Sequence, residues 1–551
     1  LSDLNREELK RPLEDLGLSL APTAKEALYT QKFYLYLNLT KPSEKVFLSY
    51  SRMDGNGQGM SPSFLISQVE RLFPGVREHG EIPLFLESPY SALDKLSEQL
   101  RSVQKESPLF EELLSWFQSQ EKFRPLVQGL IDGAYYVNPQ DGISKGVAHA
   151  LYGVELENSA TRLEQFAKCA CSHFLLYGLR LRERVRYEFS MADLGTLLHD
   201  SLDLFAKKVR EQGWQWTGLS DEERDSLAEA CVDEVVEKSG ETILLSSARN
   251  AYTVNRAKRM VKRSVWALQC QLRQGEFYPA LTEWAFGPQD GIESLNIPLG
   301  AGEHLHLRGR IDRIDVCQGK EEELYVKVID YKSGATELDF VKLYYGLQLQ
   351  LALYLNAAIE LEQRRFPGKK VKPAGIFYYQ IKDPMLNRED LKDEEHPEGE
   401  ILKKLKMDGI AGAEPEILEK LDRNLAAGKS VESVAIPVKY TAKGTFSSNS
   451  KVAYEDQFAT MRNYVNYKAK EIGQAILNGN ARVNPFEKQK ENACAYCPYA
   501  SVCGFDEKIP GYSYRRLHGY TPREVWEKMQ EDLKGGAEHG RFVDPGTEEG
   551  H

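Results

Sequence analysis

Residues 328–334, VIDYKSG, place two charged side chains at the end of an apolar run. Asp330 and Lys332 are two positions apart, so in a β-strand both project from the same face. Burying either charge alone is costly in free energy. A strand that ends in an acid and a base on one face therefore indicates a bound partner that neutralises them.

A second strand-like segment, HLHLRGRIDRIDV (304–316), lies just upstream and is joined to the first by a short, polar, glycine-containing connection. This pattern predicts an antiparallel β-hairpin. If Val316 pairs with Val326, then Asp312 faces Asp330, and opposed Cβ atoms are roughly 4.5–5.5 Å apart. Both carboxylates can then reach one ion, although a register slip of two residues would separate them.

Two carboxylates at this distance repel each other strongly unless a cation lies between them. Hard oxygen ligands with positions left for water favour Mg²⁺ or Mn²⁺ over Zn²⁺. Lys332 would then lie beside the ion, where it can orient an attacking water or bind a phosphate oxygen. In the alternative interpretation, the two acids are ordinary strand-end charges paired with Arg310, Arg313 and Lys332. Asp315, the nearby spare acid, falls on the opposite face.

Three cysteines near the C-terminus have the spacing of metal ligands. Cys494, Cys497 and Cys503 form C-x2-C-x5-C, and three thiolates need a fourth ligand to complete a site. Cys169 or Cys171 can supply it from the other end of the domain. On spacing alone, zinc and an iron–sulfur cluster are equally good occupants.

Length and composition indicate a protein with two or three cores, because 551 residues is several times the usual domain size. The net charge of -11 argues against wholesale wrapping of nucleic acid or of an anionic membrane. No apolar stretch approaches the length of a membrane span. The chain begins with Leu1, which suggests that the numbering starts inside a longer polypeptide, and no signal peptide is recognisable. We expect a cytoplasmic protein without a membrane partner.

The order of elements predicts an α/β core. Helical periodicity runs to about residue 280. Strand-like segments follow at 304–316, 323–334 and 374–381, with a helix-like segment at 341–365 between the last two. Helices and strands in this order are typical of α/β domains.

The segments GRID (309–312) and IDYKSG (329–334) together resemble the paired motifs of the RecB-like branch of the PD-(D/E)xK nuclease superfamily. The resemblance implies a mixed sheet flanked by helices. It also implies that Asp312 and Asp330 bind a divalent metal, that the backbone carbonyl of Tyr331 is a further ligand, and that Lys332 assists the attacking water.

Two further site positions follow from the same resemblance. His199, in GTLLHDSL, matches a histidine near the metal, although without the resemblance a satisfied helix histidine is the better interpretation. Gln350 and Tyr354 fit a Gln-x-x-x-Tyr pattern beside the site and are one helical turn apart. Gln348 is a rival for the glutamine, and both residues of the pattern could simply pack.

The cysteines resemble those of the AddB family, subunits of a bacterial helicase–nuclease. In that family a lone cysteine in a RLE-x-[FY]-x-x-C context joins C-x2-C-x5-C in holding a 4Fe–4S cluster. The match here, RLEQFAKC, implies Cys169 with Cys494, Cys497 and Cys503, in a structural role. The sequence reads Cys-Ala-Cys where Cys-Pro is more common, so Cys171 remains an alternative.

The segment YLYLNLTKPSEKVFLSYS (34–51) is similar to the last motif of UvrD-like helicases, but Thr40 is followed by Lys41 in place of arginine. Lysine lacks the planar fork of arginine, and no GxxxxGK[ST] loop is present. The resemblance implies an inactivated helicase-like scaffold. The expected domains are the end of a helicase-like domain (1–75), a helical connecting region (76–155), a nuclease domain with its cluster (156–510) and a partly disordered C-terminal extension (511–551).

The family resemblance implies a Mg²⁺-dependent DNA exonuclease that processes double-strand ends for recombinational repair. It would cut the 5′-ended single strand fed from an unwound duplex, in a heterodimer with an AddA-like helicase–nuclease subunit. Arg256, Arg259 and Arg263 share one helical face and are candidates for phosphate contacts, with a solvated helix face as the alternative. A catalytically silent DNA-binding scaffold is the competing hypothesis for the whole chain.

Overall fold

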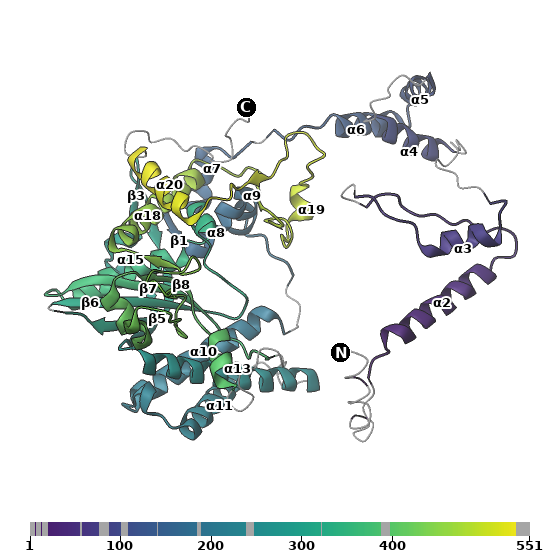
Figure 1. The fold of residues 1–551 in the computed structure, drawn as a ribbon. Helices are drawn as coiled ribbons and strands as arrows, with labels where there is room; N and C mark the ends of the chain where they lie inside the picture. Colours follow the sequence, from purple (N-terminus) through teal and green to yellow (C-terminus); the bar gives the residue numbers. More distant parts are fainter. Residues whose placement is uncertain are drawn as a thin grey trace. The chain divides into compact units, whose positions relative to one another are not determined.

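The computed structural model describes residues 6, 13, 20–54, 58–76, 88–100, 108–139, 141–184, 189–238, 247–320, 322–386 and 397–535. The chain divides into two compact units, Leu1–Ala134 and Tyr135–His551, which are considered separately (Figure 1). The boundary falls inside the segment 76–155 that the sequence suggested as a connecting region.

The described part of the first unit is mainly helical. Its helices are α2 (Ala24–Thr40), α3 (Phe64–Leu72), α4 (Pro89–Leu100), α5 (Pro108–Ser119) and α6 (Arg124–Ala134). A small core joins α4, α5 and α6 through Leu96, Phe117 and Val127. Thr23 begins α2 with a reciprocal pair of hydrogen bonds to Glu26, the capping box that favours a helix start.

The second unit is built on a six-stranded mixed sheet in the order β2-β5-β6-β7-β8-β9. The strands are β2 (Tyr278–Phe286), β5 (Gly309–Gln318), β6 (Glu323–Lys332), β7 (Lys370–Gln380), β8 (Asp408–Gly412) and β9 (Val452–Ala453). The β2-β5, β5-β6 and β7-β8 pairs are antiparallel, while β6-β7 and β8-β9 are parallel. The predicted α/β fold with a mixed sheet flanked by helices is confirmed.

The predicted hairpin register is also confirmed. Val316 pairs with Val326, and Ile314 pairs with Val328. The apolar side chains alternate between two separate cores, because both faces of the sheet are covered. Strand β2 was not expected, since helical periodicity extends to about residue 280.

Helices cover both faces of the sheet (Figure 1). One face packs against α15 (Gln350–Arg365) and α18 (Glu455–Leu477), and the other packs against α10 (Met191–Glu211), α11 (Asp221–Lys238) and α13 (Ala248–Gln274). Further α-helices among the described residues of this unit are α7 (Lys145–Tyr152), α8 (Ala160–Lys168), α9 (Ala170–His173), α14 (Phe340–Tyr344), α16 (Glu398–Lys404), α17 (Pro415–Leu421), α19 (Ala500–Cys503) and α20 (Pro522–Gly535). Two small sheets complete it: β1 (Glu155–Asn158), β4 (Glu303–Leu307) and β3 (Asn296–Gly300); and β11 (Glu491–Asn492), β10 (Phe486–Lys488) and β12 (Arg515–Arg516).

Segments far apart in sequence meet beside α8. The Ala170 amide donates to Asn484 Oδ1 at 2.8 Å, and the Cys171 amide donates to the Arg482 carbonyl at 2.9 Å. Helix α20, in the expected C-terminal extension, packs on this unit through Trp526, whose ring contacts Phe340. No helix among the described residues has the length and apolarity that crossing a membrane requires.

Candidate active site

Three neighbouring strands each place a carboxylate at the same level of the sheet. In the β2-β5 ladder Glu283 falls opposite Asp312, between the pairs Thr282–Arg313 and Trp284–Ile311. On the other side of β5, Asp312 lies one step beyond the Arg313–Ile329 pair, which brings it level with Asp330 on β6. The sheet therefore aligns Glu283, Asp312 and Asp330 across its strands.

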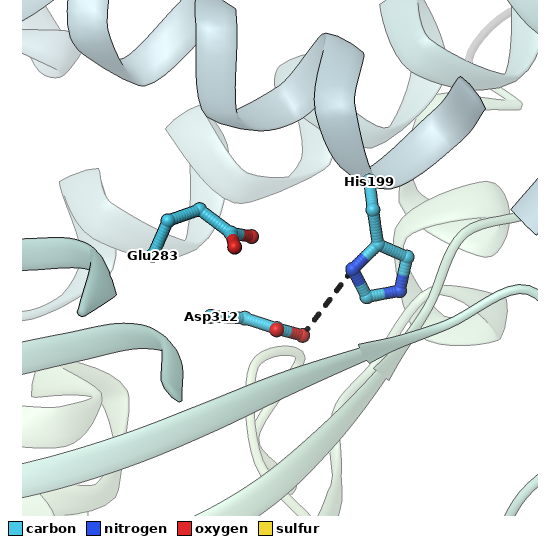
Figure 2. Close-up of side chains that lie close together, drawn as sticks. All are labelled: His199, Glu283 and Asp312. Carbon is cyan, nitrogen blue, oxygen red and sulfur yellow. Dashed lines mark ion pairs between the residues drawn. The ribbon is translucent and has the colours of Figure 1, made fainter. Parts of the chain in front are cut away.

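His199 approaches this row from α10 (Figure 2). Ligand atoms of His199, Glu283 and Asp312 all lie within 4.8 Å of one another. His199 Nδ1 is 3.5 Å from Asp312 Oδ2, and burial lowers the pKa of His199 below its ordinary value. A neutral imidazole beside carboxylates can coordinate a metal. The sequence had left open a purely structural histidine on this helix; the structure places it at the carboxylates.

Asp312 is buried, with 7% of its surface exposed. Its Oδ2 accepts a hydrogen bond from the Tyr331 amide at 2.6 Å. Burial, followed by the nearby Asp330 carboxylate, raises the pKa of Asp312 to about 8. Asp330 has this effect because the negative charges of the two carboxylates repel each other. A divalent cation between them would remove this repulsion.

Asp330, Lys332 and the first turn of α15 form a connected group. Lys332 Nζ lies 2.6 Å from Asp330 Oδ2 and donates to Gln350 Oε1 at 3.1 Å. The Gln350 amide nitrogen donates to Asp330 Oδ1 at 2.8 Å and contacts Tyr354 Oη at 3.3 Å. Burial raises the pKa of Asp330, although Lys332 opposes the shift. Gln348 instead bonds to the Asp339 amide and the Glu337 carbonyl, so Gln350 is the glutamine at the site.

The arginines of the alternative interpretation pair elsewhere. Arg310 Nε lies 2.6 Å from Glu283 Oε2. Arg313 makes a two-pronged contact with Asp315 at 2.5 and 2.8 Å, and Lys327 joins this pair on the opposite face of the strand. Within the part of the chain that the structure describes, neither arginine forms an ion pair with Asp312 or Asp330. Lys332, the third partner in that interpretation, does pair with Asp330.

Glu283 is a site residue that the sequence pattern did not reveal. Its backbone has φ of 48°, in the left-handed region that residues other than glycine seldom adopt. Burial, followed by the Asp312 carboxylate, raises the pKa of Glu283 to about 7. The available signal was the segment YPALTEWAF (278–286), an aromatic-rich stretch that could have been tested as a strand.

The donor set suits a hard divalent cation. Glu283, Asp312 and His199 offer oxygen and nitrogen atoms within 4.8 Å of one another, and among the described residues no thiolate joins this group. Asp330, level with Asp312 on the next strand, adds a carboxylate outside the group. Mg²⁺ and Mn²⁺ accept such ligands while keeping coordinated water. With Lys332 alongside, the arrangement can bind a phosphate next to an ion and an ammonium group.

The cysteines gather at a second place. Burial raises the pKa of Cys494 to about 11, with smaller contributions from Cys169, Cys497 and Cys503. Burial also raises the pKa of Cys171 to about 12, and Cys169, Cys503 and Cys497 add to the shift. Such mutual electrostatic effects require proximity, so the four predicted ligands and Cys171 lie in one cluster. The other three cysteines lie on α11, α13 and β5: Cys231, Cys270 and Cys317.

The three arginines proposed for DNA contact lie on α13. Arg259 and Arg263 each have Nε 3.6 Å from a carboxylate oxygen of Asp383, and Arg263 also lies over the Trp266 ring. Arg256 is exposed. Asp383 therefore partly neutralises Arg259 and Arg263, two of the three candidates.

Comparison with known proteins gives a family and a set of relatives. Residues 157–504 match the model of the PD-(D/E)XK nuclease superfamily. The chain is 38% identical over 98% of its length to a protein of Lachnoclostridium phytofermentans that is named as a subunit of an ATP-dependent helicase/deoxyribonuclease. It is 33% identical over 97% of its length to a protein of the same name from Alkaliphilus metalliredigens. Each alignment covers 46% of the relative, so the chain spans about half the length of the curated relatives it matches.

Proposed function

The chain belongs to the PD-(D/E)XK nuclease superfamily, and on that premise we propose that it is a Mg²⁺-dependent deoxyribonuclease. The observation that carries the proposal is the convergence of Glu283, Asp312 and His199 next to the Asp330–Lys332 pair. A scaffold has no need of aligned buried carboxylates that burial keeps from ionising.

Each residue has a role in the proposed hydrolysis of a phosphodiester. Asp312 and Asp330, with His199, Glu283 and the Tyr331 carbonyl, would hold the divalent ion. When bound, the ion supplies Lewis-acid stabilisation of the negative charge that develops on the phosphate. Lys332 orients the attacking water and places a positive charge beside the phosphate.

Gln350 keeps Lys332 in place. Its side-chain amide accepts from the ammonium group and donates to Asp330. Tyr354 lies on the other side of that amide. The Gln-x-x-x-Tyr pattern therefore supports the acid and the base together.

The proposal includes a 4Fe–4S cluster on Cys169, Cys494, Cys497 and Cys503. The match of RLEQFAKC and C-x2-C-x5-C to the cysteine pattern of the AddB family supports a cluster over a single zinc ion. Cys171 is close enough to be the alternative fourth ligand.

The cluster would act as a structural clamp. Cys169 ends α8, while the other three ligands come from the far end of the domain. Joining positions so distant in the chain removes freedom from the unfolded state, on the order of several kcal/mol by analogy with cross-links.

The relatives' names support a heterodimer. A protein named as one subunit of a helicase/deoxyribonuclease has a partner subunit, and we assign this chain an AddA-like one. The motor would unwind a DNA end, and this chain would cut the 5′-ended single strand during recombinational repair. The helical first unit would be part of an inactivated helicase-like scaffold.

The test is cleavage of 5′- and 3′-labelled single-stranded DNA by the chain, alone and with its partner subunit. Wild type should cleave in Mg²⁺ and not in EDTA. Asp330→Asn should lower kcat by about 10²–10³-fold, because several kcal/mol of transition-state stabilisation are lost. Its DNA affinity, measured in Ca²⁺, should stay within about threefold. A wild-type complex that binds DNA but cleaves nothing in Mg²⁺ or Mn²⁺ would establish the silent scaffold instead.

A further inference from the structure

The start of α15 is held by a carboxylate from another helix. Glu164, on α8, accepts hydrogen bonds at its Oε1 from the amides of Leu349 (2.8 Å) and Gln350 (3.0 Å). The first amides of an α-helix have no partner within the helix, and Leu349 supplies no side-chain cap of its own. A carboxylate at this position satisfies both amides and suits the positive end of the helix dipole.

Gln350 is also the residue whose side chain joins the acid and the base of the site. Its amide nitrogen donates to Asp330 and its amide oxygen accepts from Lys332. Glu164 therefore fixes the backbone of Gln350, and the side chain of Gln350 in turn contacts Asp330 and Lys332. No contact is needed between Glu164 and either of them.

Glu164 is half-buried and lines an open pocket of about 220 Å³ beside the site. Lys332, Gln350 and Lys168 line the same pocket, as do Lys342 and Glu491, which pair with each other. Burial raises the pKa of Glu164 to about 7, against the two amides, Lys168 and Lys332. Removing a carboxylate from water is costly in free energy, and no step of the hydrolysis itself uses Glu164.

We infer that Glu164 is a positioning residue for the proposed hydrolysis: it fixes the first turn of α15 so that Gln350 keeps Asp330 and Lys332 in their reactive arrangement. This inference rests on the proposed function. Displacement by about 1 Å of a group that orients a reaction can cost about 10²-fold in rate. A helix start that has lost its cap can move by such an amount without unfolding.

Glu164→Ala tests the inference in a double-mutant cycle with Gln350→Ala. Glu164→Ala alone should lower kcat by about 10–100-fold and change KM for DNA by less than about threefold, since the site for the strand is intact. In the Gln350→Ala background the same change should lower kcat by less than about twofold, because the residue through which Glu164 acts is already gone.

The conservative variant is a second arm. Both amides bond to a single oxygen of Glu164, and a glutamine can place its carbonyl oxygen there. Glu164→Gln should therefore retain kcat within about threefold of wild type. Glu360→Ala is the matched control on α15, because Glu360 Oε1 accepts from the Glu293 amide at 2.7 Å, away from Gln350. It should leave kcat unchanged.

A readout independent of cleavage is the rate at which Lys332 is chemically acylated, followed by peptide mass spectrometry in the full chain. Glu164→Ala should raise that rate relative to wild type and Glu164→Gln, because Lys332 loses the Gln350 contact. The inference would be overturned if the loss in kcat of the double variant equalled the product of the losses of Glu164→Ala and Gln350→Ala. An unchanged rate of Lys332 acylation in Glu164→Ala would also overturn it. Absence of cleavage in wild type would refute the proposed nuclease, while the acylation rates would still decide whether Glu164 holds this group.

Discussion

Replacing Glu283 by glutamine should weaken divalent-metal binding and, in the same protein, stabilise the metal-free state. Glu283 faces Asp312 across the β2-β5 ladder. Its raised pKa, about 7, arises from burial and from the Asp312 carboxylate. Ionised Glu283 is therefore a cost to the folded protein until a cation is bound, and a neutral amide removes that cost.

The magnitude follows from the pKa shift. A rise from 4.5 to about 7 corresponds to about 3 kcal/mol at 1.36 kcal/mol per unit. Solvent reaches part of the group and the ion pair with Arg310 is lost in the variant, so we expect a net gain of about 1–2 kcal/mol. For an acid whose folded pKa is raised, the penalty is absent below the unfolded pKa near 4.5 and is complete above 7. The gain should therefore be largest at pH 8 and small at pH 5.

The assay is thermal unfolding in EDTA at pH 5 and pH 8, paired with Mg²⁺ titration of cleavage. Glu283→Gln should raise the midpoint at pH 8 by about 2–4 °C and should need at least about tenfold more Mg²⁺ for half-maximal cleavage. Glu303→Gln is the matched control: a hydrogen bond from Lys145 lowers the pKa of buried Glu303, so this variant should lose stability and keep its Mg²⁺ dependence. A Glu283→Gln protein that is less stable at pH 8, with an unchanged Mg²⁺ requirement, would refute the reasoning.

Three further outcomes are expected. Lys332→Met should lower kcat by about 10²-fold and leave DNA affinity in Ca²⁺ within about threefold, as measured by single-turnover cleavage and filter binding. The Mg²⁺ concentration for half-maximal cleavage should fall as the pH rises from 6.5 to 8.5, because burial and Asp330 raise the pKa of Asp312, which must release its proton to bind the ion. A half-maximal concentration that does not change with pH would contradict this prediction. Anaerobically purified protein should be brown, and Cys169→Ser should abolish the visible absorption while Cys171→Ser retains it; the reverse result would assign the fourth ligand to Cys171.

The hairpin could be predicted because its information is local. Apolar side chains alternate along 304–316 and 323–334, which rules out a slip of one residue but leaves a slip of two residues open. The structure has the register in which Val316 pairs with Val326. That register by itself brings Asp312 and Asp330 to the same level of the two strands. The family resemblance implied Gln350 and Tyr354 but left Gln348 as a rival, and only the hydrogen bonds of the folded chain distinguish the two glutamines.

Glu283 could not be found in the same way. Strand β2 follows directly on the long helix α13 and its sequence does not alternate cleanly. Glu283 faces Asp312 only because β2 pairs with β5 and because the pairing register shifts between Pro279 and Leu281. The sequence also could not predict that Asp383 pairs with Arg259 and Arg263, because about 120 residues separate these partners.

The proposed thiol cluster has a consequence for the order in which the protein is made. Cys494 follows Cys169 by 325 residues, and every strand that carries the carboxylate row lies between them. On the ribosome, the row is synthesised long before Cys503 emerges, and domains tend to assemble from the N-terminal side as they are made. The iron and sulfide of the proposed cluster would therefore be inserted only when translation of this region is nearly finished. A truncated chain would carry the hydrolytic residues without the clamp that joins the two ends of their domain.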